Sequence, residues 1–186
     1  MINDTHKTIW GNRFIATAII QGGIMTLISL SMVVIQFIFA SKLNIIQFLS
    51  LSFEGPAKWF FLGIVFYLIF IVAIAVTAIF YIHLEVNLKR KISGLLNILA
   101  WVHLLGMNIG GPLATILMIF AGLSGSGIIS IFYNGTIGPQ NVQVLNAFIN
   151  PIALSIGILS IGVICGGLAY TLTYFKGKEL EKKEER

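Results

Sequence analysis

Four long runs of hydrophobic residues divide the chain, and shorter polar segments separate them. The runs cover about residues 14–40, 57–85, 92–122 and 146–175. Each run is longer than the ~18 residues that indicate a membrane-crossing helix. Within a run the hydrophobic residues follow one another without alternation, which argues against a transmembrane β-barrel. The pattern predicts an all-α membrane protein whose residues 14–175 form a bundle of four transmembrane helices.

The segments beside the runs are short. Residues 1–13 read as a polar N-terminal segment, and residues 176–186 read as a charged tail. Residues 41–56 are half apolar, which favours a loop along the membrane interface, and Pro56 suits the start of the second span. The turn at 87–91 is so short that the second and third spans are expected to pack as an antiparallel hairpin.

The connection between the third and fourth spans, residues 123–145, is rich in Gly, Ser and Asn. Asn134 and Gly135 are a common pair in two-residue turns, so a small β-hairpin is one interpretation of this segment. Asn134-Gly135-Thr136 also matches the glycosylation sequon, a hypothesis that requires the loop to face away from the cytoplasm. A tripeptide of this kind often matches by chance.

Charge is concentrated at the ends of the predicted spans. Only 10% of the residues are charged, whereas a soluble domain carries about a quarter. Of the 12 Lys and Arg residues, all except Lys42 and Lys58 fall on one side of the bundle. The positive-inside rule therefore predicts that both termini and the basic turn are cytoplasmic. We expect the net charge of +5 to set this topology in a lipid bilayer, not to bind nucleic acid. The expected location is a prokaryotic cell membrane.

The third run, 92–122, carries more polar and helix-disturbing residues than an ordinary membrane helix: Asn97, His103, Asn108 and Pro112. Such residues are costly in hydrocarbon unless they have partners, so any functional centre should involve this segment. The chain contains no P-loop, GxGxxG, HExxH, CxxC or GxSxG motif. Hydrolase, kinase and soluble-dehydrogenase functions therefore lack their usual sequence support.

One interpretation of the third run is helix packing. His103, Gly106 and Gly110 share a helix face, and Gly106-x-x-x-Gly110 allows another helix to approach closely. Gly162-x-x-x-Gly166 on the fourth run is a matching small face. On this hypothesis the His103 ring forms a hydrogen bond across the contact and fixes the register of the two helices.

A second face of the same run is also partly polar, with Asn97, Trp101, Leu104 and Asn108. A helix with two such faces is expected to be enclosed by several helices. Some of these neighbours can belong to other chains.

The other interpretation is a cofactor site. Counted from the basic residues at 1.5 Å per residue, His83 lies only about 9 Å deep and His103 about 18 Å, which disfavours a bis-histidine haem. Met25 is also predicted near 18 Å, so His103 and Met25 could bind a haem b. Cys165, near 16 Å, would complete a copper site with them. A lone Cys in an apolar run is more often a small packing residue.

Ion transport has weaker support. His83 and Glu85 at the cytoplasmic edge have the composition of a proton-entry pair, although such residues are usually interfacial and hydrated. No Asp or Glu lies deep within a predicted span, where an ion-coupled transporter usually keeps one.

The run Trp101–Asn108 (WVHLLGMN), with Pro112 and then residues 122–125 (GLSG), resembles one late helix of haem–copper oxidase subunit I. That helix carries a His, a Gly-x-Asn, a Pro and a Gly-Leu-x-Gly exit, and its His is not a metal ligand. The resemblance covers about one helix and its exit loop. The chain has three histidines, without the His-x-His and His-His pairs that bind the metal centres in that family. The resemblance implies a shortened, non-catalytic relative or an accessory subunit.

The sequence thus favours an accessory integral membrane subunit that works with other subunits of a larger complex, either a respiratory or another redox assembly. Two alternatives from other classes stay open. One is a small haem b- or copper-binding redox protein centred on His103, and the other is a small transporter or channel.

Overall fold

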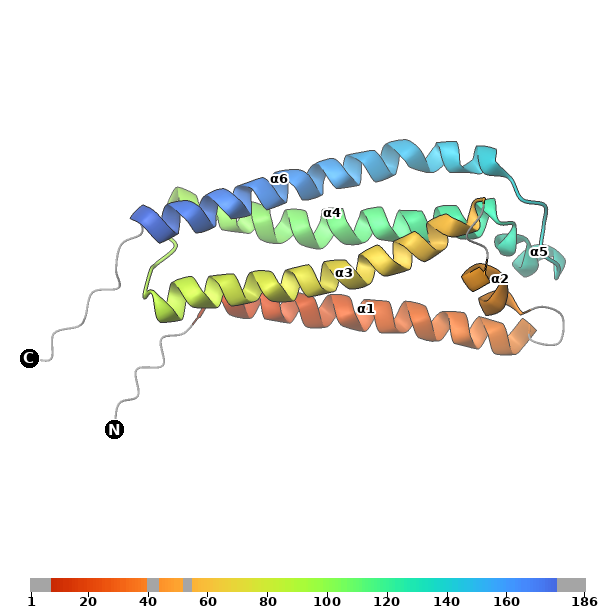
Figure 1. The fold of residues 1–186 in the computed structure, drawn as a ribbon, viewed down its shortest axis with the longest axis horizontal. Coiled ribbons are helices and arrows are strands. Elements are labelled where there is room, and N and C mark those ends of the chain that lie inside the picture. The colour runs from red at the N-terminus through yellow and green to blue at the C-terminus, as the bar shows by residue number, and fades with distance from the viewer. Residues whose placement is uncertain (1–7, 40–43, 52–54, 177–186) are drawn as a thin grey trace, which may run out of the picture.

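The computed structural model describes residues 8–39, 44–51 and 55–176, which form an all-helical bundle (Figure 1). Its four long helices are α1 (Trp10–Phe39), α3 (Ala57–Ile82), α4 (Leu95–Gly125) and α6 (Asn146–Lys176). Each is long and apolar enough to cross a membrane. No strand occurs in the described ranges. The predicted four-span, all-α fold is confirmed.

Short helical segments fill the connections. The half-apolar segment after α1 contains α2 (Ile45–Leu51), and the π-helical turn His83–Asn87 continues α3. The connection from α4 to α6 contains the 3-10 turns Ile128–Ser130 and Val142–Leu145 on either side of α5 (Ile131–Asn134). Of the predicted N-terminal segment 1–13, residues 1–7 lie outside the described residues, and 10–13 form the first turn of α1. Residues 177–186 of the charged tail also lie outside the described residues.

The predicted hairpin at Asn134 is wrong. Residues Ile131–Asn134 form one helical turn that ends at Gly135, whose φ of 69° is left-handed. The Gly135 N–H donates to the carbonyl of Ile131 at 2.9 Å, as in a helix C-cap. An Asn-Gly pair suits both a hairpin turn and a helix end, so the pair alone does not distinguish them.

Helix α4 is the enclosed helix of the bundle. Figure 1 shows α1 and α6 on opposite sides, with α3 and α4 between them. Of the most hydrophobic stretch of α4, 61% is buried, compared with 11% for α1. The expectation of an enclosed third span therefore agrees with the fold.

Glycines bring α4 and α6 into backbone contact. A Cβ atom added at Gly106 would lie 2.6 Å from the Cα of Gly162, and one at Gly110 would lie 2.7 Å from the carbonyl oxygen of Ser155. No side chain fits in either space. The structure thus brings together the two glycine motifs that the sequence suggested as a pair.

A second set of glycines brings α3 against α4, as the predicted antiparallel hairpin requires. A Cβ at Gly63 would lie 2.8 Å from the carbonyl oxygen of Thr115, and one at Gly111 would meet the ring of Phe70. At the far end of the hairpin, Gly122 lies against the backbone of Phe60. Close approach of this kind is how membrane helices gain van der Waals packing without a hydrophobic driving force.

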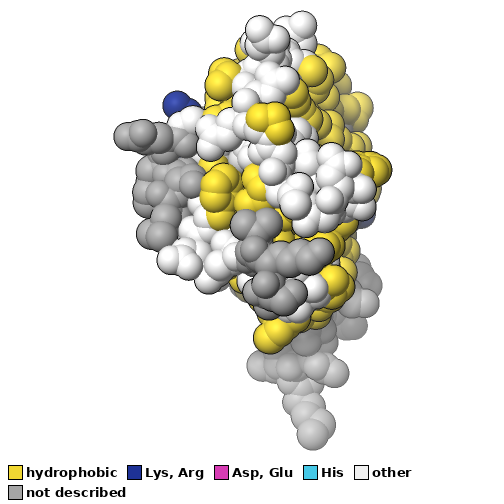
Figure 2. All heavy atoms as spheres, turned by 90° about the vertical axis from the view of Figure 1, so that its right-hand side faces the viewer, with side chains coloured by type: hydrophobic (Ala, Val, Ile, Leu, Met, Phe, Trp, Pro, Cys, Tyr) yellow, Lys and Arg dark blue, Asp and Glu magenta, His cyan; other side chains and the backbone are white. Residues whose placement is uncertain are grey.

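The two ends of the bundle differ in charge. Helix α1 begins and α6 ends at the end that also carries Glu85, Lys89, Arg90 and Lys91 (Figure 1). The opposite end, which carries α2 and α5, shows mainly hydrophobic and uncharged atoms and little Lys or Arg (Figure 2). This asymmetry is the basis for placing the charged end in the cytoplasm, which stays a prediction.

We predict that Gly106→Ala destabilises the bundle by about 1–3 kcal/mol, because the added methyl group overpacks a backbone contact that cannot yield. The free energy of unfolding in mixed micelles, measured by SDS titration, checks this. Gly157→Ala is the matched control, since a Cβ there meets nothing within 4 Å. The control should leave the free energy unchanged or raise it by up to about 1 kcal/mol. Equal effects of the two substitutions would contradict the packing account.

Candidate functional site

The His103 side chain lies in an aromatic cluster near the charged end. Its Nδ1 is 3.0 Å from the hydroxyl of Tyr81 on α3, and its ring centroid is 5.0 Å from that of Phe14 on α1. The other face of the ring covers Gly166, where a Cβ would collide with the imidazole. His103 therefore contacts α6 as predicted, but its hydrogen bond goes to α3. The expected bond across the α4–α6 contact is replaced because Gly166 presents no polar side chain.

The structure does not bring Met25 to His103. Phe14 is level with His103, and Met25 follows eleven residues later on the same helix, which is about 16 Å further along. The depth estimate failed because it took Arg13 and Lys91 to be level. In fact the guanidinium of Arg13 lies 4.5 Å from the Trp101 ring centroid, already inside α4. One haem iron cannot be ligated by both His103 and Met25 in this geometry.

The same displacement removes Met25 from the suggested copper site. Cys165 precedes Gly166 on α6 and is partly buried. In the described part of the chain, no group of three or more His, Cys, Asp or Glu residues is arranged to hold a metal ion. The side chains present do not form the copper site that the sequence suggested.

A cavity of about 320 Å³ adjoins His103 between α3 and α6. Its walls combine aromatic, hydroxyl and glycine positions, including Thr77, Phe80, Tyr81, Gly166, Gly167 and Tyr170. Sequence reasoning missed Tyr81 as the partner of His103. The predicted hairpin did not indicate this pair, because Tyr81 lies six residues before the turn at 87–91 and His103 lies twelve residues after it.

A polar network lies in the middle of the bundle. Gln21 accepts a 2.7 Å hydrogen bond from the Tyr67 hydroxyl, and its Nε2 is 3.3 Å from the carbonyl oxygen of Asn108. Pro112, four residues after Asn108, has no N–H to donate to that carbonyl. Gln21 on α1 thus supplies the donor that the proline in α4 removes. The Asn108 amide in turn donates to the carbonyl of Leu104 at 2.9 Å.

Asn97 does not join this network. It lies half-buried in the first turn of α4, where its backbone N–H donates to the carbonyl of Gly94 at 3.1 Å. Of the suggested second face of α4, Trp101 contacts Trp10 and Asn108 contacts Gln21 of α1, and Leu104 is buried in the hydrophobic cluster that includes Trp10. The second polar face therefore packs within the chain.

Glu85 caps the N-terminus of α1. Its carboxylate accepts hydrogen bonds from the Thr8 hydroxyl at 2.5 Å, from the Trp10 N–H at 3.1 Å and from the Gly11 N–H at 3.3 Å. The free N–H groups and the dipole of a helix N-terminus favour an anion at this position. The structure thus gives Glu85 a capping role in place of the suggested proton-entry pair with His83. The Nδ1 of His83 instead lies 3.1 Å from Asn87 within the π-helical turn.

Arg13 fixes the same end of α1. Its guanidinium carbon lies 4.5 Å from the ring centroids of both Trp10 and Trp101. The two indoles pack edge to face at 5.3 Å. Cation–π contacts of this kind join the first turn of α1 to the second turn of α4 next to the Glu85 cap.

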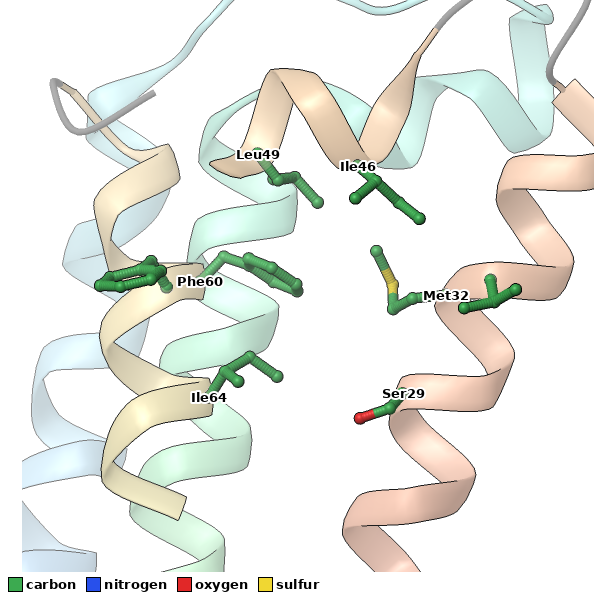
Figure 3. Close-up of a pocket in the computed structure, with 8 residues that line it drawn as sticks. Ser29, Met32, Ile46, Leu49, Phe60 and Ile64 are labelled. Carbon is green, nitrogen blue, oxygen red and sulfur yellow. The ribbon is translucent and has the colours of Figure 1, made fainter. Parts of the chain in front are cut away.

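A second cavity, of about 220 Å³, lies at the opposite end, where α1 and α3 diverge. Figure 3 shows Met32 on α1 pointing toward Ile46 and Leu49 of α2, with Phe60 and Ile64 on the α3 side. Helix α2 lies across this gap and is anchored by the buried side chains of Ile45 and Leu49. Among the lining residues, Ser29 is the polar one, so this cavity is apolar.

Asn134 of the sequon is exposed at the end of α5. Its side chain is therefore accessible, and glycosylation there stays a prediction.

Compared with protein-family models, curated proteins and solved structures, the chain has no significant match.

We predict that Glu85→Ala frays the start of α1, because three donors lose their acceptor, and costs about 1–2 kcal/mol, as for the loss of an N-cap. Amide hydrogen exchange should become faster at Trp10 and Gly11 and stay unchanged in the middle of α1. Glu85→Gln keeps one oxygen acceptor without the charge, so its exchange rates should fall between those of the wild type and Glu85→Ala. Unchanged exchange at Trp10 and Gly11 in Glu85→Ala would refute the capping role.

Proposed function

We propose that the chain is an accessory, non-catalytic integral membrane subunit of a larger complex, in which it packs against a transmembrane helix of another subunit. The observation that carries this proposal is a surface of mostly small residues, interrupted by Ile164, on the side of α6 that faces away from the bundle. We call this surface the outer face of α6. It consists of Ala153, Gly157, Ser160, Ile164, Gly167 and Thr171, all exposed.

The spacing of the outer face suits a helix partner. Its members are separated alternately by four and three residues, the repeat that packs one helix along another. From Ala153 to Thr171 the face extends about 27 Å, close to the hydrocarbon thickness of about 30 Å. A partner helix could therefore follow it across most of the bilayer.

The glycines of this face are not explained by contacts within the chain. A Cβ at Gly157 or Gly167 would meet nothing within 4 Å, whereas the glycines of the α4–α6 contact have backbone atoms there. Glycine in a helix interior costs roughly 0.5–1 kcal/mol relative to alanine. Small residues at an interface offset this cost by allowing close helix approach.

The exposed side of α1 also has a glycine without contacts, Gly23, but large side chains make up most of this surface. It presents large aliphatic side chains such as Ile19, Leu27, Leu30 and Val34. This surface suits lipid acyl chains, so we assign α1 to the lipid and the outer face of α6 to the partner.

The redox character of the complex rests on the resemblance of α4 to a helix of haem–copper oxidase subunit I. The transporter alternative gains no support, because Gln21, Tyr67 and Asn108 bond to one another within the bundle. A haem b or copper bound at His103 would need ligands other than Met25. An absorption spectrum and a metal analysis of the purified complex test that alternative.

We predict that the double substitution Gly157→Leu/Ser160→Leu releases the chain from its complex, because two large side chains prevent close approach of the partner helix. Native mass spectrometry after extraction in a mild detergent should find the wild-type chain with partner chains and the variant alone. Both positions are exposed, so the variant chain should remain folded.

The matched control is Gly23→Leu/Thr26→Leu on α1, which places the same side chains at the same spacing on the lipid-facing surface. This variant should stay in the complex. A wild-type chain that is extracted as a lone monomer, or equal release of the two variants, would contradict the proposal.

A further inference from the structure

The cavity beside His103 is lined by a ring nitrogen that makes no hydrogen bond within the fold, Nε2 of His103. Tyr81 is 1% exposed, and its hydroxyl finds its hydrogen-bond partner in Nδ1 of His103. A buried tyrosine hydroxyl needs an acceptor, so the Tyr81 O–H donates and Nδ1 accepts. In a neutral imidazole the proton is then on the other nitrogen, Nε2, which becomes a donor. A neutral ring is the form expected within a membrane span.

The Nε2–H group keeps some accessible surface. Among the described residues, no buried side-chain nitrogen or oxygen lacks a hydrogen-bond partner. The hydrogen bond of the His103 ring is made by Nδ1, so Nε2 is not one of the buried atoms. His103 lines the cavity between α3 and α6, and the cavity is the space into which Nε2 can donate.

The rest of the cavity is suited to a flat ring. Phe80 and Tyr170 pack edge to face at 5.8 Å and form an aromatic wall. Gly166 and Gly167 contribute backbone without side chains on the α6 side. The volume of 320 Å³ is at the lower end of the range of about 300–1,000 Å³ for small-molecule sites.

We propose that this cavity binds the head group of a lipid-soluble quinone, with one ring carbonyl oxygen accepting the hydrogen bond from Nε2 of His103. The carbonyl satisfies the donor, the ring lies against the aromatic wall, and the apolar tail extends into the bilayer. An acyl chain alone fills the space but leaves Nε2–H without an acceptor. The Tyr81 bond also disfavours a metal at Nε2. A neutral imidazole that binds a metal through Nε2 carries its proton on Nδ1. Nδ1 could then no longer accept the hydrogen bond from the Tyr81 hydroxyl.

This inference goes beyond the subunit function proposed above and can fail separately from it. Gly167 and Thr171 line the cavity and also belong to the outer face of α6. Gly157 and Ser160 belong to the outer face alone. Substitutions at the two pairs of positions therefore separate ligand binding from subunit docking.

The experiment measures equilibrium binding of decyl-ubiquinone to the full chain in phosphatidylcholine nanodiscs, with decylbenzene as the probe that lacks a carbonyl. The wild type should bind the quinone at least tenfold more tightly than decylbenzene. Gly167→Leu should lose quinone binding, because the new side chain fills the cavity from a position with no internal contact. His103→Leu/Tyr81→Phe should abolish the preference for the carbonyl without leaving a buried hydroxyl unpaired.

Gly157→Leu/Ser160→Leu is the control and should bind the quinone as the wild type does, even where it no longer joins the complex. Three results would overturn the proposal: no quinone binding above the lipid background, equal affinity for the two probes, or unchanged affinity in Gly167→Leu. Circular dichroism of each variant verifies its helical fold. A folded His103→Leu/Tyr81→Phe variant that keeps the preference for the carbonyl would assign the hydrogen bond to another group.

Discussion

Backbone contact between α4 and α6 is the interaction on which the remaining features depend. In lipid, helices gain little from hiding apolar side chains, so association relies on close packing. Gly106 and Gly162 meet with no room for a side chain, and one turn away the absent side chain of Gly166 makes room for the His103 ring. The position of that ring sets its bond to Tyr81 and the shape of the adjacent cavity. The glycine contacts that hold α4 against α6 therefore also position the His103 ring and shape the candidate site.

A second constraint is that polar backbone groups inside a membrane must find partners within the protein. At two positions where a helical backbone group lacks its regular partner, a side chain from another part of the bundle supplies the hydrogen bond. Gln21 of α1 donates to the carbonyl that Pro112 leaves free in α4. Glu85, just beyond α3, accepts the free N–H groups at the start of α1. These bonds fix the relative levels of α1, α3 and α4.

Much of the fold could be predicted because each membrane-crossing helix is a long, uninterrupted run of hydrophobic residues in the sequence. The predicted span of 57–85 corresponds to Ala57–Ile82 and its π-helical turn, and the paired glycine motifs lie in contact. The level of α1 could not be predicted, because counting from Arg13 assumes that basic residues end a span. Here the Arg13 guanidinium contacts the rings of Trp10 and Trp101, so Arg13 lies deeper than Lys91. Met25 was placed beside His103 for that reason, and the roles of Tyr81 and Glu85 likewise depend on tertiary contacts.

The most direct test of this account is solid-state NMR of the protein in lipid bilayers with its glycines and histidines labelled with carbon-13. The account predicts a strong cross peak between the α-carbons of Gly106 and Gly162 at short mixing time, because the two backbones touch. A second prediction from the same spectrum is a contact between the Gly166 α-carbon and the labelled imidazole of His103. The absence of the Gly106–Gly162 cross peak in a well-resolved spectrum would contradict the account.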